Sequence, residues 1–230
     1  WRTVQGGGRE YVRRIAERLH DVRLACPVQC IEREACGLHV RHAGGSESFD
    51  QVVLACHSDQ ALAIAGGAVS AGQREVLAAI RYQPNRAVLH TDRVLLPRDE
   101  KLWSAWNYIA GSGEIGEQPV GVSYLINRLQ PLPFATPVIV TLNPARAPDP
   151  AKVVSWFDYD HPIFDGAAIA AQQRLASVQG EHGLWLAGAW GRYGFHEDGL
   201  RSALLVANRL GVFAPWQGGE CAAPRALAAA

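Results

Sequence analysis

One stretch of the sequence decides the fold, and it reads Leu184-Trp185-Leu186-Ala187-Gly188-Ala189-Trp190-Gly191-Arg192-Tyr193-Gly194-Phe195-His196-Glu197-Asp198-Gly199-Leu200. It predicts an apolar strand from Leu184 to Ala187, a turn rich in glycine and aromatic residues, and an amphipathic helix from about Asp198 to Leu210. The first N–H groups of a helix lack partners within it and the helix dipole is positive there, so this helix start favours anionic or electron-rich ligand atoms. An ordinary strand-to-helix connection, with Asp198 as the N-cap, has the same spacing.

Upstream of this stretch, helical and strand-like patterns alternate. Apolar positions at helical spacing predict an amphipathic helix between Tyr11 and Leu19. Ser70, with Gln73 three residues later, has the pattern of a capping box and predicts a helix to Ile80, and Ser58 predicts a shorter helix. Three strand-like runs come before these helices: Cys26 to Ile31, Leu38 to His42 and Phe49 to Ala55. The last run contains the continuously apolar Val52-Val53-Leu54-Ala55, which we expect to be buried on both faces.

The sequence pattern changes between Gln83 and Asp158. Short β-rich runs alternate there with proline and glycine turns, which predicts an inserted, mostly antiparallel sheet. The runs are Ala87 to His90, Trp103 to Tyr108, Val120 to Leu125, Val138 to Leu142 and Val153 to Phe157. Helical spacing returns at about Asp165 to Val178. We therefore expect an α/β fold in which residues 1–82 and 159–216 form one domain, residues 83–158 form an inserted sheet domain, and residues 217–230 form a loose tail.

The bulk composition narrows the class of partner. The formal net charge is zero, so no global field favours nucleic acid or an anionic membrane, and we expect a small-molecule substrate. No apolar run reaches the roughly 18 residues of a membrane-spanning helix, which makes a soluble cytoplasmic protein the expectation. The five cysteines include no Cys-x-x-Cys pair and have no matching histidine spacing, so we predict no metal site. The chain begins at Trp1 and contains no methionine, which indicates a piece of a longer protein.

The stretch from Leu184 to Leu200 resembles the last FAD-binding element of the glutathione-reductase-type flavoproteins, in particular of the flavin-containing amine oxidase superfamily. Pro27-Val28-Gln29-Cys30-Ile31 and Val52-Val53-Leu54-Ala55-Cys56 are similar to the middle FAD-binding portion of the same family. The segments "YQPNRAVLHTD", "WSAWNY" and "GFHEDGLRSAL" resemble a bacterial group of amine-oxidase-like proteins. This resemblance implies a partial, Rossmann-like FAD-binding domain with an inserted substrate-binding sheet.

The resemblance also implies which residues hold FAD, without a covalent bond. In that family a strand ending in Ala-Gly leads to a helix whose first N–H groups face the flavin pyrimidine edge. Gly188 and Ala189 would lie along the ribityl and pyrophosphate chain, and Gly199 and Leu200 would place backbone N–H groups at flavin N1 and O2. Ala189 stands where the family usually has an acidic residue. The remaining expected cofactor contacts are Val28, through its backbone to the adenine, Cys56, Trp190 and Asp198.

Candidate catalytic residues are fewer, because flavin chemistry needs a shaped apolar pocket more than a dedicated acid–base pair. The resemblance places His196 at the flavin-facing end of the last loop. The aromatic residues expected to shape the pocket are Tyr193, Phe195, Trp106 and Tyr108. Arg86 lies near the point where amine oxidases place a lysine that holds a water molecule. Each of these residues also fits a structural role, as a core or rim aromatic or as a surface arginine.

The Gly-x-Gly-x-x-Gly fingerprint that opens a helix after a strand is absent from this pattern of predicted elements. We therefore expect the FAD pyrophosphate site upstream of Trp1. The predicted function is FAD-dependent, amine-oxidase-like oxidation of an unidentified organic substrate. Two alternatives stay open: a non-catalytic module of the same fold that binds a lipid or a partner enzyme, and a desaturase or isomerase of isoprenoid-like substrates.

Overall fold

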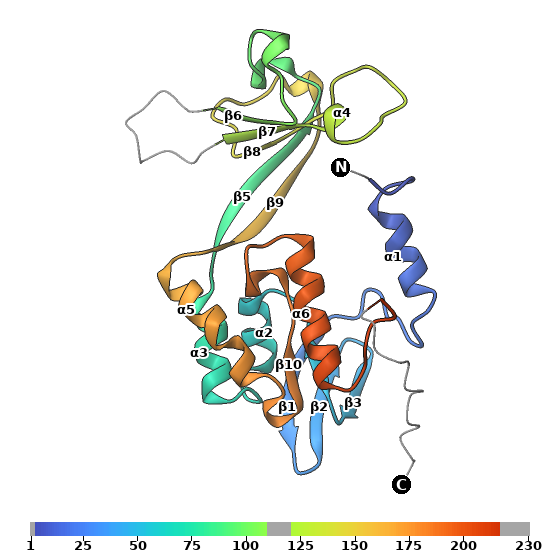
Figure 1. The fold of residues 1–230 in the computed structure, drawn as a ribbon, viewed down its shortest axis with the longest axis vertical. Helices are drawn as coiled ribbons and strands as arrows, with labels where there is room; N and C mark the ends of the chain where they lie inside the picture. The colour runs from blue at the N-terminus through green and yellow to red at the C-terminus, as the bar shows by residue number, and fades with distance from the viewer. Residues whose placement is uncertain (1–2, 110–120, 217–230) are drawn as a thin grey trace. The chain divides into compact units, whose positions relative to one another are not determined.

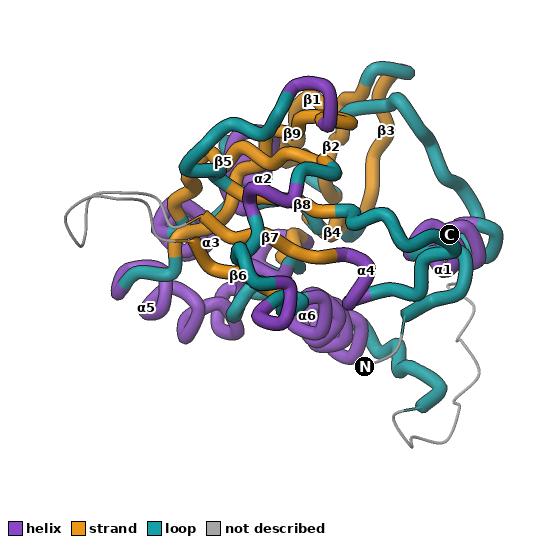
Figure 2. The backbone as a smooth tube through the Cα atoms, turned by 90° about the horizontal axis from the view of Figure 1, so that it is seen from above, coloured by secondary structure: helices purple, strands orange, loops and turns teal. Residues whose placement is uncertain are grey.

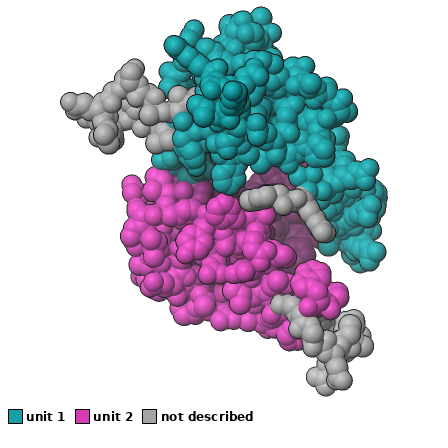
Figure 3. Space-filling model, turned by 45° about the horizontal axis from the view of Figure 1, so that its top comes forward, with its two compact units in different colours: residues 1–22, 83–161 teal, residues 23–82, 162–230 magenta. Residues whose placement is uncertain are grey.

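The computed structural model describes residues 3–109 and 121–216, so the expected loose tail, residues 217–230, lies outside the described part. The chain divides into two compact units, coloured separately in Figure 3. The α/β unit comprises residues 23–82 and 162–230, and the sheet unit comprises residues 1–22 and 83–161. Residues 1–22 thus group with the sheet unit, whereas the sequence pattern had placed them with residues 23–82. The assignment of the units to FAD and to substrate stays a proposal.

The strands of the α/β unit form two small sheets (Figure 1). The strands β1 (Val28–Glu34), β2 (Gly37–His42) and β3 (Gly45–Phe49) pair in that order as antiparallel neighbours. The strands β4 (Val52–Leu54) and β10 (Leu184–Leu186) pair in parallel, with Leu54 opposite Leu186. This parallel pair joins two segments that are far apart in the sequence.

The expected strand from Phe49 to Ala55 is divided between β3 and β4. Its apolar end was expected to be buried on both faces, and this prediction is wrong. Leu54 is buried, but Val53 is 44% exposed. Side chains alternate along a strand, so Val53 points away from the core into which Leu54 packs.

Helices cover the core of the α/β unit. They are α2 (Ser58–Ala65), α3 (Ala71–Ala79), α5 (Gly166–Arg174) and α6 (His196–Arg209). Helix α3 packs against α2 and α5, and α6 packs against β10. The expected helix to Val178 ends as an α-helix at Arg174 and continues as a 3-10 turn, Leu175–Val178. The largest fully buried apolar side chains of this core are Leu38, Leu77, Leu184, Leu186 and Val76.

The predicted capping box at the start of α3 is confirmed. The hydroxyl oxygen of Ser70 accepts from the N–H of Gln73 at 3.0 Å, and the amide oxygen of Gln73 accepts from the N–H of Ser70 at 3.1 Å. The same Gln73 side chain is fully buried, and its Nε2 donates to the carbonyl oxygens of Val178 and Leu184, both at 3.0 Å. Gln73 therefore ties α3 to the segment that leads into β10.

The sheet unit holds the predicted antiparallel sheet, whose strand order is β6-β7-β8-β5-β9. Figure 2 colours the same elements by type. The strands are β5 (Arg81–His90), β6 (Trp106–Ile109), β7 (Gly121–Leu125), β8 (Ile139–Leu142) and β9 (Val153–Ile163), and the helices are α1 (Gly8–Ala16) and the single-turn α4 (Ile126–Leu129). The predicted combination of helices with an inserted antiparallel sheet is confirmed.

One face of this sheet carries a connected row of buried polar side chains. His90 Nδ1 accepts from the N–H of Asp92 at 3.0 Å, which leaves Nε2 as the protonated nitrogen that donates to the hydroxyl oxygen of Thr141 at 2.8 Å. The Thr141 hydroxyl in turn lies 2.8 Å from that of Ser123. Burial lowers the pKa of His90, because a charged imidazole would lose its hydration there. The polar groups of this row are therefore neutral and hydrogen-bonded to one another.

We expect Gln73→Leu to lower the free energy of unfolding by about 2–4 kcal/mol, because it removes two buried hydrogen bonds and half of the capping box. Urea unfolding monitored by circular dichroism measures the change. Gln60→Leu makes the same chemical change at an exposed position of α2 and is the control, expected to change stability by less than about 0.5 kcal/mol. Equal stabilities for the two variants would contradict the role given to Gln73.

Candidate functional site

The carboxyl ends of β4 and β10 lie at one edge, because the two strands are parallel. The N–H of Ala187 extends the ladder by donating to the carbonyl oxygen of Leu54 at 3.0 Å. Beyond this point the chain leaves β4 through residues 55–57 and leaves β10 through residues 187–195. We call these two connections, together with the first turn of α6, the β4–β10 edge. Ligands of open α/β sheets bind at such edges.

Trp190 locks the two connections together. Its side chain is buried, and the indole Nε1 donates to the carbonyl oxygen of Cys56 at 3.1 Å. The amide of Gln172, on α5, donates to the carbonyl oxygens of Trp190 and Arg192 at 2.8 and 2.7 Å. The turn after β10 therefore has a fixed shape. Burial also raises the pKa of the Cys56 thiol, which keeps it protonated.

Two glycines set how closely the turn approaches its surroundings. A Cβ added to Gly188 would lie 2.3 Å from the indole Nε1 of Trp190, so the observed turn requires glycine there. A Cβ added to Gly199 would meet Ala189 at ordinary contact distances of 3.8 and 3.9 Å. The N–H of Gly188 donates to the Ser202 hydroxyl at 2.9 Å. The turn is thereby joined to the first turns of α6.

Helix α6 begins at His196, two residues earlier than the sequence pattern predicts. Asp198, the N-cap in the alternative of an ordinary strand-to-helix connection, is the third helical residue, where its carboxylate accepts from the N–H of Phe195 at 3.1 Å. The N–H of Gly199 donates to the carbonyl oxygen of Phe195 at 3.2 Å. Within the described residues, the helix-start N–H groups that contact no acceptor are those of His196 and Glu197. The resemblance assigned the flavin-facing N–H groups to Gly199 and Leu200. Because the helix starts earlier than predicted, the free N–H groups belong to residues that precede these two.

The aromatic candidates of this turn point outward. Tyr193 is 73% exposed and Phe195 is 67% exposed, and His196 is also exposed. Gly194 between them has a φ of +88°, the left-handed conformation that glycine adopts most readily, and its backbone lies against the ring of Phe164. These side chains have room to contact a bound molecule, and none of them is needed to fill the core.

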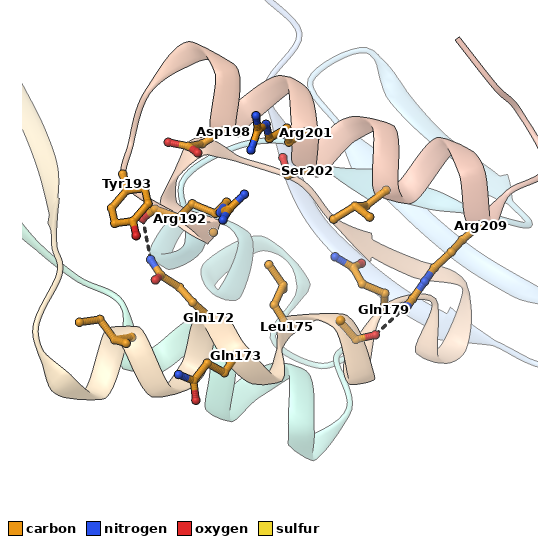
Figure 4. Close-up of a pocket in the computed structure, with 14 residues that line it drawn as sticks. Gln172, Gln173, Leu175, Gln179, Arg192, Tyr193, Asp198, Arg201, Ser202 and Arg209 are labelled. Atoms are coloured by element: carbon orange, nitrogen blue, oxygen red, sulfur yellow. Dashed lines mark hydrogen bonds between the residues drawn. The ribbon is translucent and has the colours of Figure 1, made fainter. Parts of the chain in front are cut away.

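A cavity of about 540 Å³ lies between α5 and α6, beside the same turn (Figure 4). Its walls combine apolar side chains such as Leu175 with Arg192, Arg201 and Arg209. The buried Asp198 and the hydroxyl of Ser202 also line it. The sequence reading missed this cavity. The signal that could have indicated it is the spacing of Arg201, Leu205 and Arg209, which places three long side chains on one face of α6.

The second face of the five-stranded sheet is apolar across β5 to β8 and is exposed where β6 carries its aromatic side chains. The strand register aligns Trp106, Tyr124, Val140 and Leu89 in one row across four strands. The next row on this face begins with Tyr108, which is 72% exposed, while Trp106 is 47% exposed and stands edge-on to Tyr124. We call these two rows the aromatic face. The first row and Tyr108 present no charged side chain, and Tyr108 is one of the aromatic residues that were expected from the sequence to shape a pocket.

The predicted site residues fall in three places. Cys56, Gly188, Ala189, Trp190, Tyr193, Phe195, His196, Asp198, Gly199 and Leu200 gather at the β4–β10 edge. Val28 begins β1 in the other sheet of the α/β unit. Trp106 and Arg86 belong to the sheet unit, where the Arg86 guanidinium stacks over the Trp156 ring at 4.3 Å. Their assignment to cofactor and catalysis stays a prediction.

Two further features bear on a cofactor. The segment Gly111-Ser112-Gly113-Glu114-Ile115-Gly116 has dinucleotide-type glycine spacing, but it connects β6 to β7, which pair as antiparallel neighbours. A dinucleotide fingerprint joins a strand to a helix that crosses to a parallel strand, whereas the strands before and after this segment are antiparallel, and the segment itself lies outside the described residues. Within residues 3–109 and 121–216, no group of three potential ligands could hold a metal ion.

The chain is similar to known flavoenzymes. Residues 1–114 match the family described as flavin containing amine oxidoreductase. A search of curated proteins finds no match in sequence. No helix of the described residues is long and apolar enough to cross a membrane.

Solved structures extend the likeness over most of the chain. A CLA-producing fatty acid isomerase from P. acnes matches 90% of this chain and 52% of its own, with a TM-score of 0.61 and 14% identity. A protein assigned as a protoporphyrinogen oxidase, from Exiguobacterium sp. 255-15, matches 91% and 52%, with a TM-score of 0.64 and 13% identity. Putrescine oxidase bound to putrescine matches 90% and 53%, with a TM-score of 0.60 and 15% identity. The chain has their fold and spans about half of their length.

We expect Gly188→Ala to lower the free energy of unfolding by about 1–3 kcal/mol, because the added methyl group collides with the fixed Trp190 indole. Gly199→Ala is the matched control: its methyl group fits, and alanine favours a helix by up to about 1 kcal/mol over glycine. Thermal and urea unfolding of both variants measures the difference. If Gly188→Ala is as stable as Gly199→Ala, the turn is not held as described.

Proposed function

We propose that the protein containing this chain is an FAD-dependent oxidoreductase that binds FAD without a covalent bond at the β4–β10 edge. The observation that carries this proposal is the pair of free N–H groups of His196 and Glu197, at the positive end of the fourteen-residue helix α6 and directly after the glycine-rich turn. The family match over residues 1–114 and the fold of the matched structures support it.

The residues of this edge fit a flavin in three respects. The two free donors suit the electron-rich carbonyl edge of the ring. Gly188, Ala189 and Gly199 expose little side chain, so a flat molecule can approach the backbone. Trp190 and Gln172 hold the turn in place before any ligand arrives. The flavin supplies the hydride-accepting chemistry when bound, and the role proposed for this chain is to hold and orient it.

For the substrate we propose an apolar organic molecule. The aromatic face offers rings and aliphatic side chains at partial exposure, and its first row and Tyr108 carry no charge. A diamine such as putrescine, the molecule bound in one matched structure, would favour carboxylates. An apolar chain such as that of a fatty acid, named in another match, fits the face better. In the α/β unit, Tyr193, Phe195 and His196 are the proposed contacts at the β4–β10 edge. In the sheet unit, Trp106 is the proposed aromatic contact and Arg86 the proposed polar one.

The same observation favours a second candidate function. An apolar face without acid–base groups also suits a flavin-dependent desaturase or isomerase, in which the cofactor carries the chemistry. Anaerobic reduction of the flavin by substrate separates the candidates. Net reduction by a single substrate indicates an oxidase or desaturase, conversion without net reduction indicates an isomerase, and a stable flavin that no substrate changes indicates a non-catalytic module.

We expect the 230-residue chain alone to bind FAD weakly or not at all, with a dissociation constant well above about 1 µM, because residues 3–109 and 121–216 contain no strand-to-helix fingerprint for the pyrophosphate. Isothermal titration with FAD measures the affinity. The protein that also contains such a unit is expected to purify yellow. Sub-micromolar binding by the chain alone would show that the main cofactor contacts are elsewhere than proposed.

We expect His196→Pro, in the flavin-binding protein, to weaken FAD binding by about 3- to 10-fold, the worth of one hydrogen bond. His196 is the first residue of α6, a position where proline fits a helix, and Phe195 before it has ψ 161°, which proline tolerates. The substitution therefore removes one free N–H and leaves the helix intact. His196→Ala keeps that N–H and is the control for loss of the side chain.

Flavin content per folded chain and the affinity of the FAD-free protein for FAD are the measurements. The proposal fails if His196→Pro is folded and binds FAD as tightly as His196→Ala. A slower reduction by substrate in His196→Ala, with normal flavin content, would support a place for the imidazole in the reaction pocket.

A further inference from the structure

Three side chains of the antiparallel β1-β2-β3 sheet form a connected line that the proposed function does not use. Cys26 precedes β1, His42 ends β2 and Glu47 lies on β3. The Cys26 sulfur is 3.2 Å from His42 Nδ1, and His42 Nε2 is 3.1 Å from a carboxylate oxygen of Glu47. A thiol, an imidazole and a carboxylate in this order are the components of an activated cysteine nucleophile.

The hydrogen bonds determine which imidazole nitrogen carries the proton. The N–H of Gly44 donates to Nδ1 at 3.1 Å, so Nδ1 is the acceptor nitrogen of the neutral ring. Nε2 then carries the hydrogen and donates it to Glu47. The Cys26 thiol donates to the same Nδ1, which is the atom that can take its proton. Proton transfer gives up the Gly44 hydrogen bond, which limits how far it proceeds.

Two charged groups, Glu47 and Arg23, lie beside Nε2 of the imidazole. Arg23 forms an ion pair with Glu47 and, together with His42, lowers the pKa of that carboxyl group, so the carboxylate stays ionised into the acidic range. The ionised carboxylate accepts the hydrogen of His42 Nε2 and orients the ring. The Arg23 guanidinium lies 3.4 Å from the same nitrogen. Only 10% of the His42 side chain is exposed, so water screens these interactions incompletely.

The sulfur is open to a small reagent. Cys26 is partly exposed, and a Cβ on the neighbouring Gly44 would lie 3.7 Å from the sulfur and 3.3 Å from the imidazole. The glycine thus leaves space above the pair. Cys36 offers an internal comparison: it is more exposed, and no hydrogen-bond partner of its thiol is found among the described residues.

We propose that Cys26 is a nucleophilic thiol that exchanges with small-molecule disulfides, with His42 as its general base and Glu47 as the residue that positions His42. His42 Nδ1 takes the thiol proton, and the thiolate attacks one sulfur of the disulfide. The new bond joins Cys26 to that sulfur while the old sulfur–sulfur bond breaks. The leaving thiolate takes the proton from His42. Cys26 is oxidised, and the leaving sulfur is reduced.

The rates of two cysteines in the same molecule test this proposal. The 230-residue chain is incubated with hydroxyethyl disulfide, a small uncharged disulfide, between pH 6 and 9, and the adducts at Cys26 and Cys36 are quantified by peptide mass spectrometry. An unassisted thiol has a pKa near 8.5 and is about 1% ionised at pH 6.5. Because His42 Nδ1 can take the thiol proton, we expect Cys26 to react about 10-fold faster than Cys36 at pH 6.5, with the ratio falling towards one at pH 9, where an unassisted thiol is largely ionised.

Variants distinguish an effect of His42 as the base from an effect of how accessible the Cys26 thiol is. His42→Gln is expected to slow Cys26 about 10-fold at pH 6.5 and to leave Cys36 unchanged, and Glu47→Gln is expected to have an intermediate effect. His39→Gln changes another histidine of β2, which contacts Ser48 and no thiol, and is the control. Equal rates for the two cysteines at pH 6.5 in the unaltered chain would overturn the proposal. A folded His42→Gln variant with an unchanged Cys26 rate would overturn it as well.

Discussion

The parallel pairing of β4 with β10 is the constraint on which the rest of the α/β unit depends. Three residue pairs join the two segments that make up the α/β unit, and the turn, the start of α6 and the neighbouring cavity all follow this ladder. Such a short ladder contributes little by itself. Its stability comes from groups that bind it from outside, above all the buried amide of Gln73 and the indole of Trp190.

Local chemistry made much of this fold predictable from the sequence. The capping box of Ser70 and Gln73 involves residues three apart, and both of its hydrogen bonds are present. The change from helical spacing to short alternating runs at Gln83 marks the start of the antiparallel sheet within a few residues. The Leu184–Leu200 stretch likewise forms a strand, a turn and a helix. In each case neighbours in the sequence decide the outcome.

The sequence could not predict features that depend on contacts between distant segments. Asp198 has the propensity of an N-cap, yet the helix starts two residues earlier and the Asp198 carboxylate accepts from the N–H of Phe195. Nothing local pairs Cys26 with His42, because their contact depends on the β1–β2 pairing and the turn after it. The α5–α6 cavity requires two helices whose crossing no spacing reveals.

The insertion of residues 83–161 has a consequence for the order of folding. The two halves of the α/β unit must meet across this segment, and closing an unstructured loop of that length costs about 4 kcal/mol of chain entropy. Strand β5 leads into the insertion and strand β9 leads out of it, and the two are neighbours in its sheet. Once that sheet has formed, the ends of the loop are already adjacent, and most of the chain entropy of loop closure has already been lost. Rapid assembly of β4 with β10 thus depends on the sheet unit folding first.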